Sequence, residues 1–251
     1  RNDLELVRHR ADGVGAVHTM LVLLLGPVSW RLPGVRTPIS LYTSQACVGH
    51  EPGGSHPERP ARLEQLLRAL KGKWVYEFGE SLQVCEPAVD VTEAQVLRVH
   101  TRGHVAKVNS AFAASQLLRR VKLDSDTVAS PGTGAAARRA AGLVVAAVDD
   151  VLGDHEDTRE ARPRRAFVMA RPPGHHADAG QAQGFCFYNN VLIGVAHAEA
   201  AHGLSRVAIL DFDVHHGNGD ADIAEDEPSR LYAAQRGATA LLVGARPRTP
   251  P

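Results

Sequence analysis

Two carboxylates and an imidazole follow a short apolar run at residues 207–210. They are Asp211, Asp213 and His215, and because side chains alternate along a strand, we expect all three to point to one side. Carboxylates gathered at a strand end repel one another and lose hydration unless a cation lies among them. Oxygen and nitrogen ligands without thiolate suit Zn²⁺, Mn²⁺ or Fe²⁺ in a catalytic site. The pattern therefore predicts a divalent-metal site, with an acidic strand end and solvated histidines as the alternative.

Further polar groups are expected to converge on the same place. The turn Gly217-Asn218-Gly219 reverses the chain and carries the Asn218 amide back toward it. His175 and His176 follow two prolines and a glycine, which make a stiff loop that fixes where the rings point. Imidazole is the side chain best suited to move protons near neutral pH. We predict that both histidines are acid–base residues facing the metal, with a packing role as the alternative.

The elements that must position these residues alternate between short apolar strands and helices. Strands of the buried, parallel-sheet type are predicted at Ile39–Thr43, 166–170 and 207–210. Thr92 and Gln95 form a capping-box pattern that opens a short helix around Val96 to Val99. Longer helices are expected from Ala61, over 104–118, over 133–152 and over 191–202, the last capped by Asn189 or Asn190.

Four residues in loops or on first turns are weaker candidates for substrate contacts. Arg62 could reach below the end of the sheet, or be an ordinary surface arginine. Asp126 is either a loop carboxylate or a rim residue that holds a ligand's backbone. Gly184 and Phe185 could wall a narrow tube, although aromatic residues in this segment are core residues by default.

Composition limits the classes of function. The chain of 251 residues carries 28 basic and 28 acidic residues, so it does not read as an electrostatic nucleic-acid binder. Three widely spaced cysteines fit a reducing compartment, which favours cytoplasm or nucleus. No apolar run approaches the roughly 20 residues of a membrane span. The apolar segment 20–28 leaves a plastid or mitochondrial address open, and we expect residues 1–38 to be a poorly ordered extension.

Three motifs, taken in order, resemble the zinc-dependent histone deacetylase family. They are RPPGHHA from Arg171, GFCFYNNV from Gly184 and ILDFDVHHGNG from Ile209. Asn218, SHPERPARL and LDSDTVASPGTG are similar to the class II and bacterial or plant branch. The resemblance covers residues 39–232 and implies an arginase-like α/β fold, a parallel sheet with helices on both faces and a site at the carboxyl ends of strands, as in open α/β sheets generally.

The resemblance also implies residue roles. Asp213 and His215 would be two of three zinc ligands, and His176 a general base oriented by Asn218. His175 would be an electrostatic or acid partner paired with Asp211, which in the family also helps to hold a structural K⁺. The substrate contacts would come from Gly184 and Phe185 in an acyl-lysine tunnel, Asp126 at its rim and Arg62 beside an internal acetate cavity.

The chemistry so implied is hydrolysis of the acetyl-lysine amide in histones or other proteins by a metal-activated water. The partner is an acetylated protein or peptide, without nucleic acid or membrane. Manganese ureohydrolases, which share the fold, acetylpolyamine amidohydrolases and a non-catalytic binding module are the alternatives. The paired His175 and His176 after Pro-Pro-Gly argue against the ureohydrolase.

The sequence departs from the family after Tyr232. The family's third zinc ligand, an Asp, and its oxyanion-stabilising Tyr come from later segments, whereas residues 233–251 contain no Asp, Glu, His or Tyr. We therefore expect a partial deacetylase domain over 39–232, a divergent tail over 233–251 and a sheet that is incomplete at its C-terminal side. A truncated or frame-disrupted gene is the explanation we favour at this stage, and the polypeptide is expected to be a weak catalyst or none.

Overall fold

The structure is a computed structural model that describes residues 21–23, 38–153, 165–236 and 239–243. Its strands form two larger sheets and one two-stranded ladder within this part of the chain. The strand bounds are β1 Leu21–Leu23, β2 Ile39–Thr43, β3 Leu82–Cys85, β4 Val121–Lys122, β5 Val128–Ala129, β6 Ala166–Met169, β7 Val207–Asp211, β8 Arg230–Arg236 and β9 Thr239–Val243.

The longer helices lie close to the positions that the apolar pattern predicts, whereas the two helices Lys73–Phe78 and Asn218–Glu225 were not predicted. The helices are α1 Ala61–Lys71, α2 Lys73–Phe78, α3 Glu93–Val96, α4 Arg102–Leu118, α5 Thr133–Leu152, α6 Asn190–His202 and α7 Asn218–Glu225, with short 3-10 turns η1 Gln45–Gly49 and η2 Gly79–Ser81. The capping box at Thr92 and Gln95 is present, but the helix that it opens is α3, which ends at Val96 instead of running to Val99.

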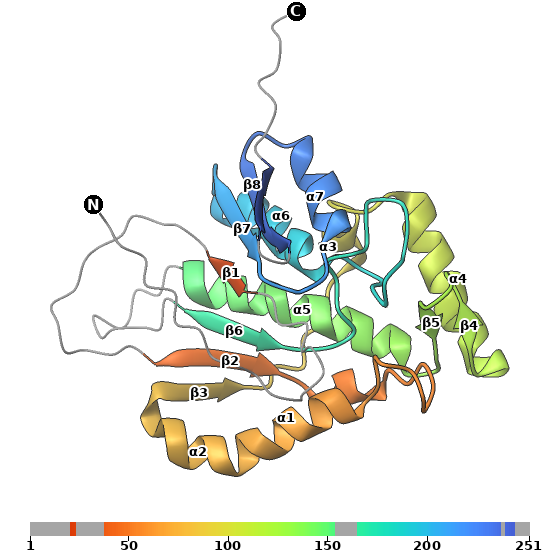
Figure 1. Cartoon of the computed structure of the whole chain (residues 1–251), viewed down its shortest axis with the longest axis horizontal. Coiled ribbons are helices and arrows are strands. Elements are labelled where there is room, and N and C mark those ends of the chain that lie inside the picture. Colours follow the sequence, from red (N-terminus) through yellow and green to blue (C-terminus); the bar gives the residue numbers. More distant parts are fainter. Residues whose placement is uncertain (1–20, 24–37, 154–164, 237–238, 244–251) are drawn as a thin grey trace, which may run out of the picture.

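One sheet has the order β3-β2-β6 and is parallel throughout. Figure 1 shows α1 and α2 along one side of it and α5 along the other. Leu63, Leu67 and Leu70 from α1 pack in one apolar cluster with Leu41 of β2 and Leu143 of α5. This three-stranded sheet therefore has the helix cover on both faces that a buried parallel sheet requires.

The other sheet has the order β1-β7-β8-β9, in which only β7 and β8 are parallel. β1 falls in the apolar segment for which the sequence assigned no role, and it pairs antiparallel with β7. β9 lies in the divergent tail and pairs antiparallel with β8. The expected parallel sheet is thus present in two parts, and Leu210, Phe212 and Val214 near the end of β7 remain substantially exposed.

A long pair of helices connects the two sheets. α5 packs against β2 and β6 on one side and against α6 on the other, and α6 in turn lies beneath the β7–β8 pair (Figure 1). Ile193 of α6 and Ile209 of β7 belong to one buried cluster. Since the two sheets share this central layer, the loops after β6 and β7 can approach each other.

Candidate active site

β7 ends at Asp211, one residue beyond the strand predicted at 207–210. Asp213 and His215 lie outside the strand, so the strand alternation that was expected to align them with Asp211 does not apply to them. Side-chain to backbone hydrogen bonds hold them instead: Asp213 N donates to Asp211 Oδ1 at 3.0 Å and His215 N donates to Asp213 Oδ1 at 2.8 Å. Such Asx-type contacts stiffen a turn without a strand ladder.

The predicted metal ligands have their donor atoms together. His215 Nδ1 lies 3.0 Å from Asp213 Oδ1, with the Asp213 side chain 6% exposed and that of His215 59% exposed. A carboxylate oxygen and an imidazole nitrogen on a partly open site fit two positions of a catalytic zinc. Within the described residues, no third carboxylate, thiol or imidazole joins them in a group of three with donor atoms inside 4.8 Å.

The His176 ring lies beside this pair. Its centroid is 6.2 Å from that of His215 and 4.0 Å from that of His175. His176 Nδ1 donates to Asn218 Oδ1 at 2.7 Å, a contact that places the proton on Nδ1 and leaves Nε2 as the basic nitrogen. A Cβ on Gly184 would lie 2.4 Å from His176 Cδ2, so only glycine lets the chain approach the ring so closely.

His175 is coupled to Asp211 in the interior. His175 Nδ1 donates to Asp211 Oδ2 at 3.0 Å, and the Tyr232 hydroxyl donates to the same oxygen at 3.1 Å. Burial lowers the pKa of His175, but the hydrogen bond and charge of Asp211 outweigh it and raise the pKa above its usual value. Burial also acts to raise the pKa of Asp211, and the contact with His175 instead holds it below the usual range. The geometry thus favours an imidazolium–carboxylate pair.

The Gly184 loop continues to a rim on the outside. The Phe185 backbone has φ 69 and its N donates to Thr127 Oγ1 at 3.0 Å. The Phe185 ring packs edge-on against His56, with centroids 4.8 Å apart, and His56 Nε2 contacts Asp126 O at 2.9 Å. Gly184, Phe185 and Asp126 are therefore joined through His56 and Thr127 into one continuous stretch beside His176. Asp126 itself is exposed.

Arg62 lies elsewhere. Its Nη1 donates to Glu58 Oε2 at 2.6 Å, and Arg171 Nε donates to the other oxygen, Oε1, at 2.9 Å. Glu58 is fully buried, and Arg171 immediately precedes the loop that carries the paired histidines. Arg62 thus takes part in a buried ion-pair cluster that ties α1 to this loop.

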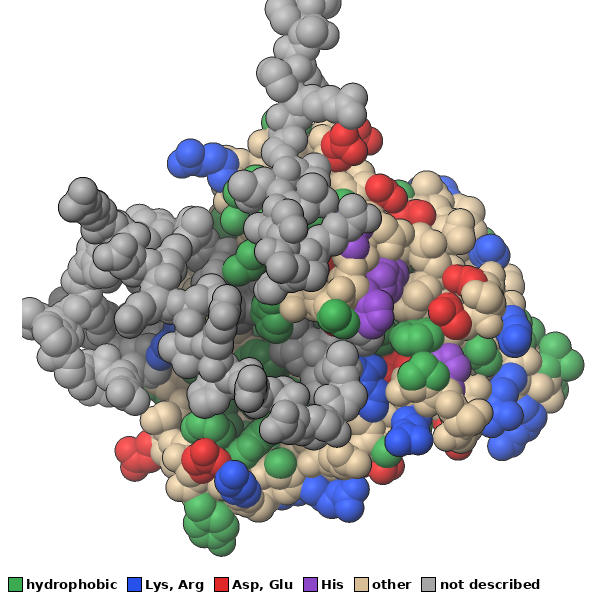
Figure 2. Space-filling view, in the orientation of Figure 1, with side chains coloured by type: hydrophobic (Ala, Val, Ile, Leu, Met, Phe, Trp, Pro, Cys, Tyr) green, Lys and Arg blue, Asp and Glu red, His purple; other side chains and the backbone are tan. Residues whose placement is uncertain are grey.

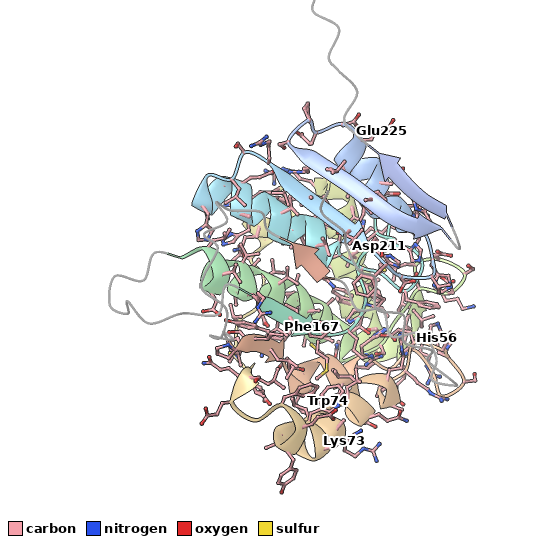
Figure 3. The ribbon with its side chains drawn as sticks, turned by 60° about the vertical axis from the view of Figure 1, so that its left-hand side comes forward. His56, Lys73, Trp74, Phe167, Asp211 and Glu225 are labelled. Carbon is pink, nitrogen blue, oxygen red and sulfur yellow. The ribbon has the colours of Figure 1, made fainter. Side chains whose placement is uncertain are left out.

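Two views show where labelled residues and histidine side chains lie on the molecule. Asp211 and His56 lie on the same side of the molecule in Figure 3. Histidine side chains gather at the surface in Figure 2, next to hydrophobic side chains. A structural K⁺ near Asp211 stays a prediction. Both carboxylate oxygens of Asp211 accept hydrogen bonds from the protein.

Sequence reasoning missed three contributors. Glu58 and Asp220 are fully buried, and Tyr232 contacts Asp211. Asp220 Oδ1 accepts from Asn189 Nδ2 at 2.7 Å, and burial raises the pKa of Asp220 to about 7. Tyr232 could have been suspected as a polar aromatic in a buried strand, whereas no local pattern marks Glu58 or Asp220.

The comparisons with known proteins agree with this architecture. The family model for the histone deacetylase domain matches residues 56–234 of this chain. The chain therefore belongs to the histone deacetylase family. It is similar to histone deacetylase 15 of Arabidopsis thaliana, with 39% identity over 177 residues that cover 70% of this chain and 29% of that protein. It is 36% identical to polyamine deacetylase HDAC10 of Rattus norvegicus, covering 70% of this chain and 28% of that protein.

A solved structure supports the same fold. The crystal structure of the HDA15 HD domain matches with a TM-score of 0.67 and 33% identity, over 79% of this chain and 53% of that chain. The fold is therefore the arginase-like α/β fold of the family, present in part. The chain spans less than a third of the two relatives and about half of the solved domain. None of the described helices has the length and apolarity to cross a membrane.

Proposed function

We propose that this site belongs to a zinc-dependent deacetylase that hydrolyses the amide of N6-acetyl-lysine in histones or other proteins. The observation that carries the proposal is the meeting of Asp213 and His215 donor atoms beside the His175–His176 pair. Acid–base groups next to metal donors are what amide hydrolysis at neutral pH requires. Membership of the deacetylase family supports the same reaction class.

Asp213 and His215 would hold the ion. When bound, zinc polarises the acetyl carbonyl and lowers the pKa of a bound water to about 7. Their nitrogen and oxygen donors fit zinc, but they are two ligands where a catalytic zinc takes three from protein.

His176 takes the proton from water in this proposal. Its Nδ1–H is committed to Asn218, so Nε2 is the atom that accepts the proton and later delivers it to the lysine amine. His175, paired with Asp211, is the electrostatic or acid partner in this proposal. Gly184 and Phe185 line the acyl-lysine chain, and Asp126 accepts from the substrate backbone at the rim.

We also propose that the 251-residue polypeptide alone is a weak catalyst. We assign two zinc ligands, Asp213 and His215, among the described residues, and residues 233–251 contain no Asp, His or Tyr to add a third ligand or an oxyanion donor. Loss of one oxyanion donor typically lowers kcat by about 10²–10³. We therefore expect zinc-dependent ligand binding to persist while turnover is slow.

Binding and turnover test the two statements separately. In the first experiment, a peptide with a hydroxamate in place of acetyl-lysine is titrated into the chain with and without Zn²⁺. We expect binding only with Zn²⁺, and its loss in the paired variant Asp213→Ala, His215→Ala. Binding that ignores Zn²⁺ or survives both substitutions would refute the metal site.

In the second experiment, turnover of an acetyl-lysine peptide is compared with that of Arabidopsis histone deacetylase 15 under the same conditions. We expect at least about 10²-fold lower turnover in this chain. Equal turnover, blocked by the hydroxamate, would overturn the weak-catalyst proposal and leave the assignment of the reaction intact.

The similarity to a polyamine deacetylase favours one second candidate. An acetylated polyamine is the smaller, cationic substrate, and the exposed Asp126 at the rim could attract its charge. Competition between an acetylated polyamine and the acetyl-lysine peptide for the zinc-loaded chain decides between them. If neither ligand binds, a non-catalytic binding module is the remaining interpretation.

For localisation we propose cytoplasm or nucleus, with an organelle as the alternative. The three cysteines are free thiols, as a reducing compartment allows. Membership of the deacetylase family makes an acetylated protein or peptide the proposed partner, and the equal numbers of basic and acidic residues do not favour nucleic acid.

A further inference from the structure

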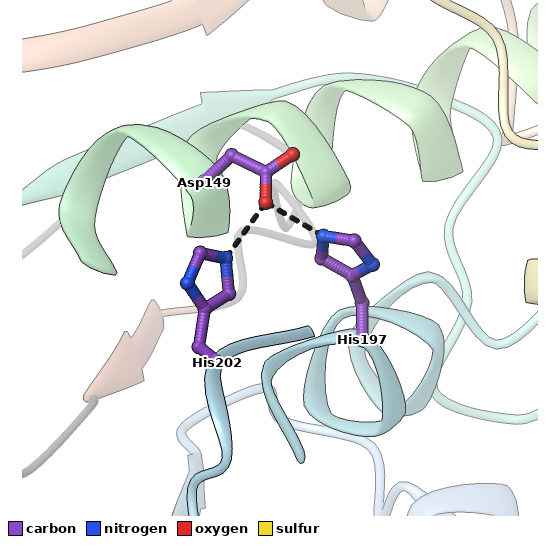
Figure 4. A group of neighbouring side chains, drawn as sticks. All are labelled: Asp149, His197 and His202. Carbon is purple, nitrogen blue, oxygen red and sulfur yellow. Dashed lines mark hydrogen bonds and ion pairs between the residues drawn. The ribbon is translucent and has the colours of Figure 1, made fainter. Parts of the chain in front are cut away.

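A second group of potential metal ligands lies away from the active site. Asp149 is in the last turn of α5, and His197 and His202 lie in the C-terminal half of α6 (Figure 4). One oxygen, Asp149 Oδ1, contacts His197 Nε2 at 2.6 Å and His202 Nε2 at 2.8 Å. The three ligand atoms all lie within 4.8 Å of one another.

We propose that Asp149, His197 and His202 bind a divalent first-row transition metal ion that joins the C-terminal ends of α5 and α6. Two imidazoles and one carboxylate without thiolate suit Zn²⁺, Ni²⁺ or Cu²⁺, with water completing the coordination. Mg²⁺ and Ca²⁺ prefer oxygen ligands and do not match this set.

The geometry needs only a small opening to admit an ion. Ligand atoms about 2.0–2.1 Å from a tetrahedral zinc lie about 3.4 Å apart, so both contacts to Asp149 Oδ1 must lengthen by somewhat less than 1 Å. Rotation of the Asp149 carboxylate can provide this, because its side chain is 52% exposed. His197 and His202 are only 10% and 18% exposed, so the imidazoles are held in place and the carboxylate faces the route of entry.

Protonation states at the cluster are compatible with binding. Although burial opposes it, the hydrogen bonds from His202 and His197 hold the pKa of Asp149 below its usual range, so the carboxylate is ionised. A neutral imidazole that binds metal through Nε2 carries its proton on Nδ1. His197 Nδ1 lies 3.5 Å from Gln95 Nε2, a contact at the limit of a hydrogen bond that is readily given up.

The cluster is remote from the chemistry. α6 has 13 residues, and the side chain of its N-cap, Asn189, contacts Asp220 near the paired histidines. At 1.5 Å per residue, His197 and His202 are about 12 and about 20 Å from Asn189 along the helix axis. An ion here would therefore fix α6 on α5, the layer that connects the two sheets, and would take no part in hydrolysis.

The test is a Zn²⁺ titration of the full chain by calorimetry after metal removal. The parent carries Asp213→Ala and His215→Ala, which removes the ligands proposed for the catalytic ion. We expect one Zn²⁺ per chain with a Kd in the micromolar range or tighter. Adding Asp149→Asn or His202→Asn should weaken binding at least about tenfold, whereas Asp150→Asn, the neighbouring carboxylate on the same turn of α5, should change Kd less than about twofold.

A second readout guards against loss of folding in the variants. The imidazole nitrogen resonances of His197 and His202 should shift together on addition of one equivalent of Zn²⁺, and those of His100 and His104 should not. The absence of Zn²⁺ binding by the parent at millimolar concentration would overturn the proposal. Unchanged binding after Asp149→Asn and His202→Asn would do so as well.

Discussion

The Gly184–His176 contact is one of the tight steric constraints at the site. A Cβ at Gly184 would meet the His176 ring at 2.4 Å, and the backbone has φ 56 there. Gly203 also has a positive φ, 66, but open space around it. Alanine at Gly203 would therefore meet backbone strain alone, whereas alanine at Gly184 would meet backbone strain and a steric clash.

We predict that Gly184→Ala destabilises the protein more than Gly203→Ala does. The left-handed backbone costs an alanine about 1–2 kcal/mol at either position, and the clash at Gly184 adds about 1–3 kcal/mol. Urea unfolding of both variants measures the difference. Equal losses would show that the His176 ring moves aside freely and is not held by Asn218.

Asp220 gives the site a pH-dependent stability. Burial raises its folded-state pKa to about 7, above the unfolded value of about 3.9. Between these two pKa values the folded protein holds a proton on Asp220 that the unfolded chain has released. The contribution of this proton to the free energy of unfolding is complete below about pH 4 and is lost as the pH rises to 7. We predict that Asp220→Asn, which stays neutral, reduces the fall in stability between pH 5 and 8.

Unfolding free energies at pH 5, 6, 7 and 8 provide the measurement, with Asp222→Asn as the matched control. Asp222 is exposed on the same helix, α7, so its variant should follow the wild-type pH profile. A steeper fall in Asp220→Asn than in the wild type would contradict the buried, protonated carboxyl.

Residue-level reasoning from sequence predicted the candidate site residues but not all of the contacts that hold them. Asp213 and His215 are recognisable because carboxylates and imidazoles cluster after an apolar run. Their actual placement depends on hydrogen bonds from backbone N–H groups in the turn, which strand alternation does not describe. Asp220 was missed because its partner, Asn189, is 31 residues away in the chain.

Among the elements, α6 is tied to the site through its N-cap residue, Asn189. Asn189 caps it by accepting from Leu192 N at 2.9 Å, and its Nδ2 donates to Ala177 O at 3.0 Å and to Asp220. α4 has a simpler cap, in which Thr101 accepts from His104 N. The two caps provide a matched pair.

We predict that Asn189→Ala costs about 2–4 kcal/mol of unfolding free energy, and Thr101→Ala about 1 kcal/mol. Loss of either cap costs about 1 kcal/mol, and Asn189→Ala also leaves two buried acceptors without their donor. Urea denaturation of the two variants measures this difference. If the costs are equal, the two hydrogen bonds donated by Asn189 Nδ2 contribute nothing to stability.

Helices were more predictable than strands because their signals are local. The Ala-rich pattern predicted residues 133–152, and α5 has these bounds. The capping box at Thr92 likewise needs only four consecutive residues. β1 was not predicted, since its pairing with β7 depends on contacts distant in sequence. β9 was not predicted either, although it pairs with the strand next to it in the chain, β8.

At the scale of the whole molecule, Glu58 connects α1 to the loop that carries His175 and His176. It is fully buried between Arg62 and Arg171, and so links α1 to the loop of paired histidines. A neutral amide cannot compensate both guanidinium groups, and Arg171 is only 4% exposed. We predict that Glu58→Gln lowers the free energy of unfolding by about 3–5 kcal/mol.

Thermal and urea unfolding test this expectation, with Glu64→Gln on the exposed face of α1 as the control. Glu64→Gln should change stability by less than about 0.5 kcal/mol. A Glu58→Gln variant as stable as this control would show that other contacts hold α1 to the loop of paired histidines.

The whole-molecule arrangement was predicted in part. The family resemblance implied parallel strands with helices on both faces, and β3-β2-β6 with α1 and α5 has this form. The division into two sheets, with antiparallel β1 and β9 at the ends of the second, could not be read from apolar periodicity. Periodicity identifies a buried strand but not its neighbours.

The account depends on one ion lying between Asp213 and His215. The most direct measurement is an anomalous difference map at the zinc absorption edge, from crystals of the chain grown with Zn²⁺. We predict a peak about 2.0–2.2 Å from an Asp213 carboxylate oxygen and from His215 Nδ1, with the His175 and His176 rings beside it. A map with no peak at Asp213 and His215, even when zinc occupies the site of Asp149, His197 and His202, would contradict the proposed catalytic ion.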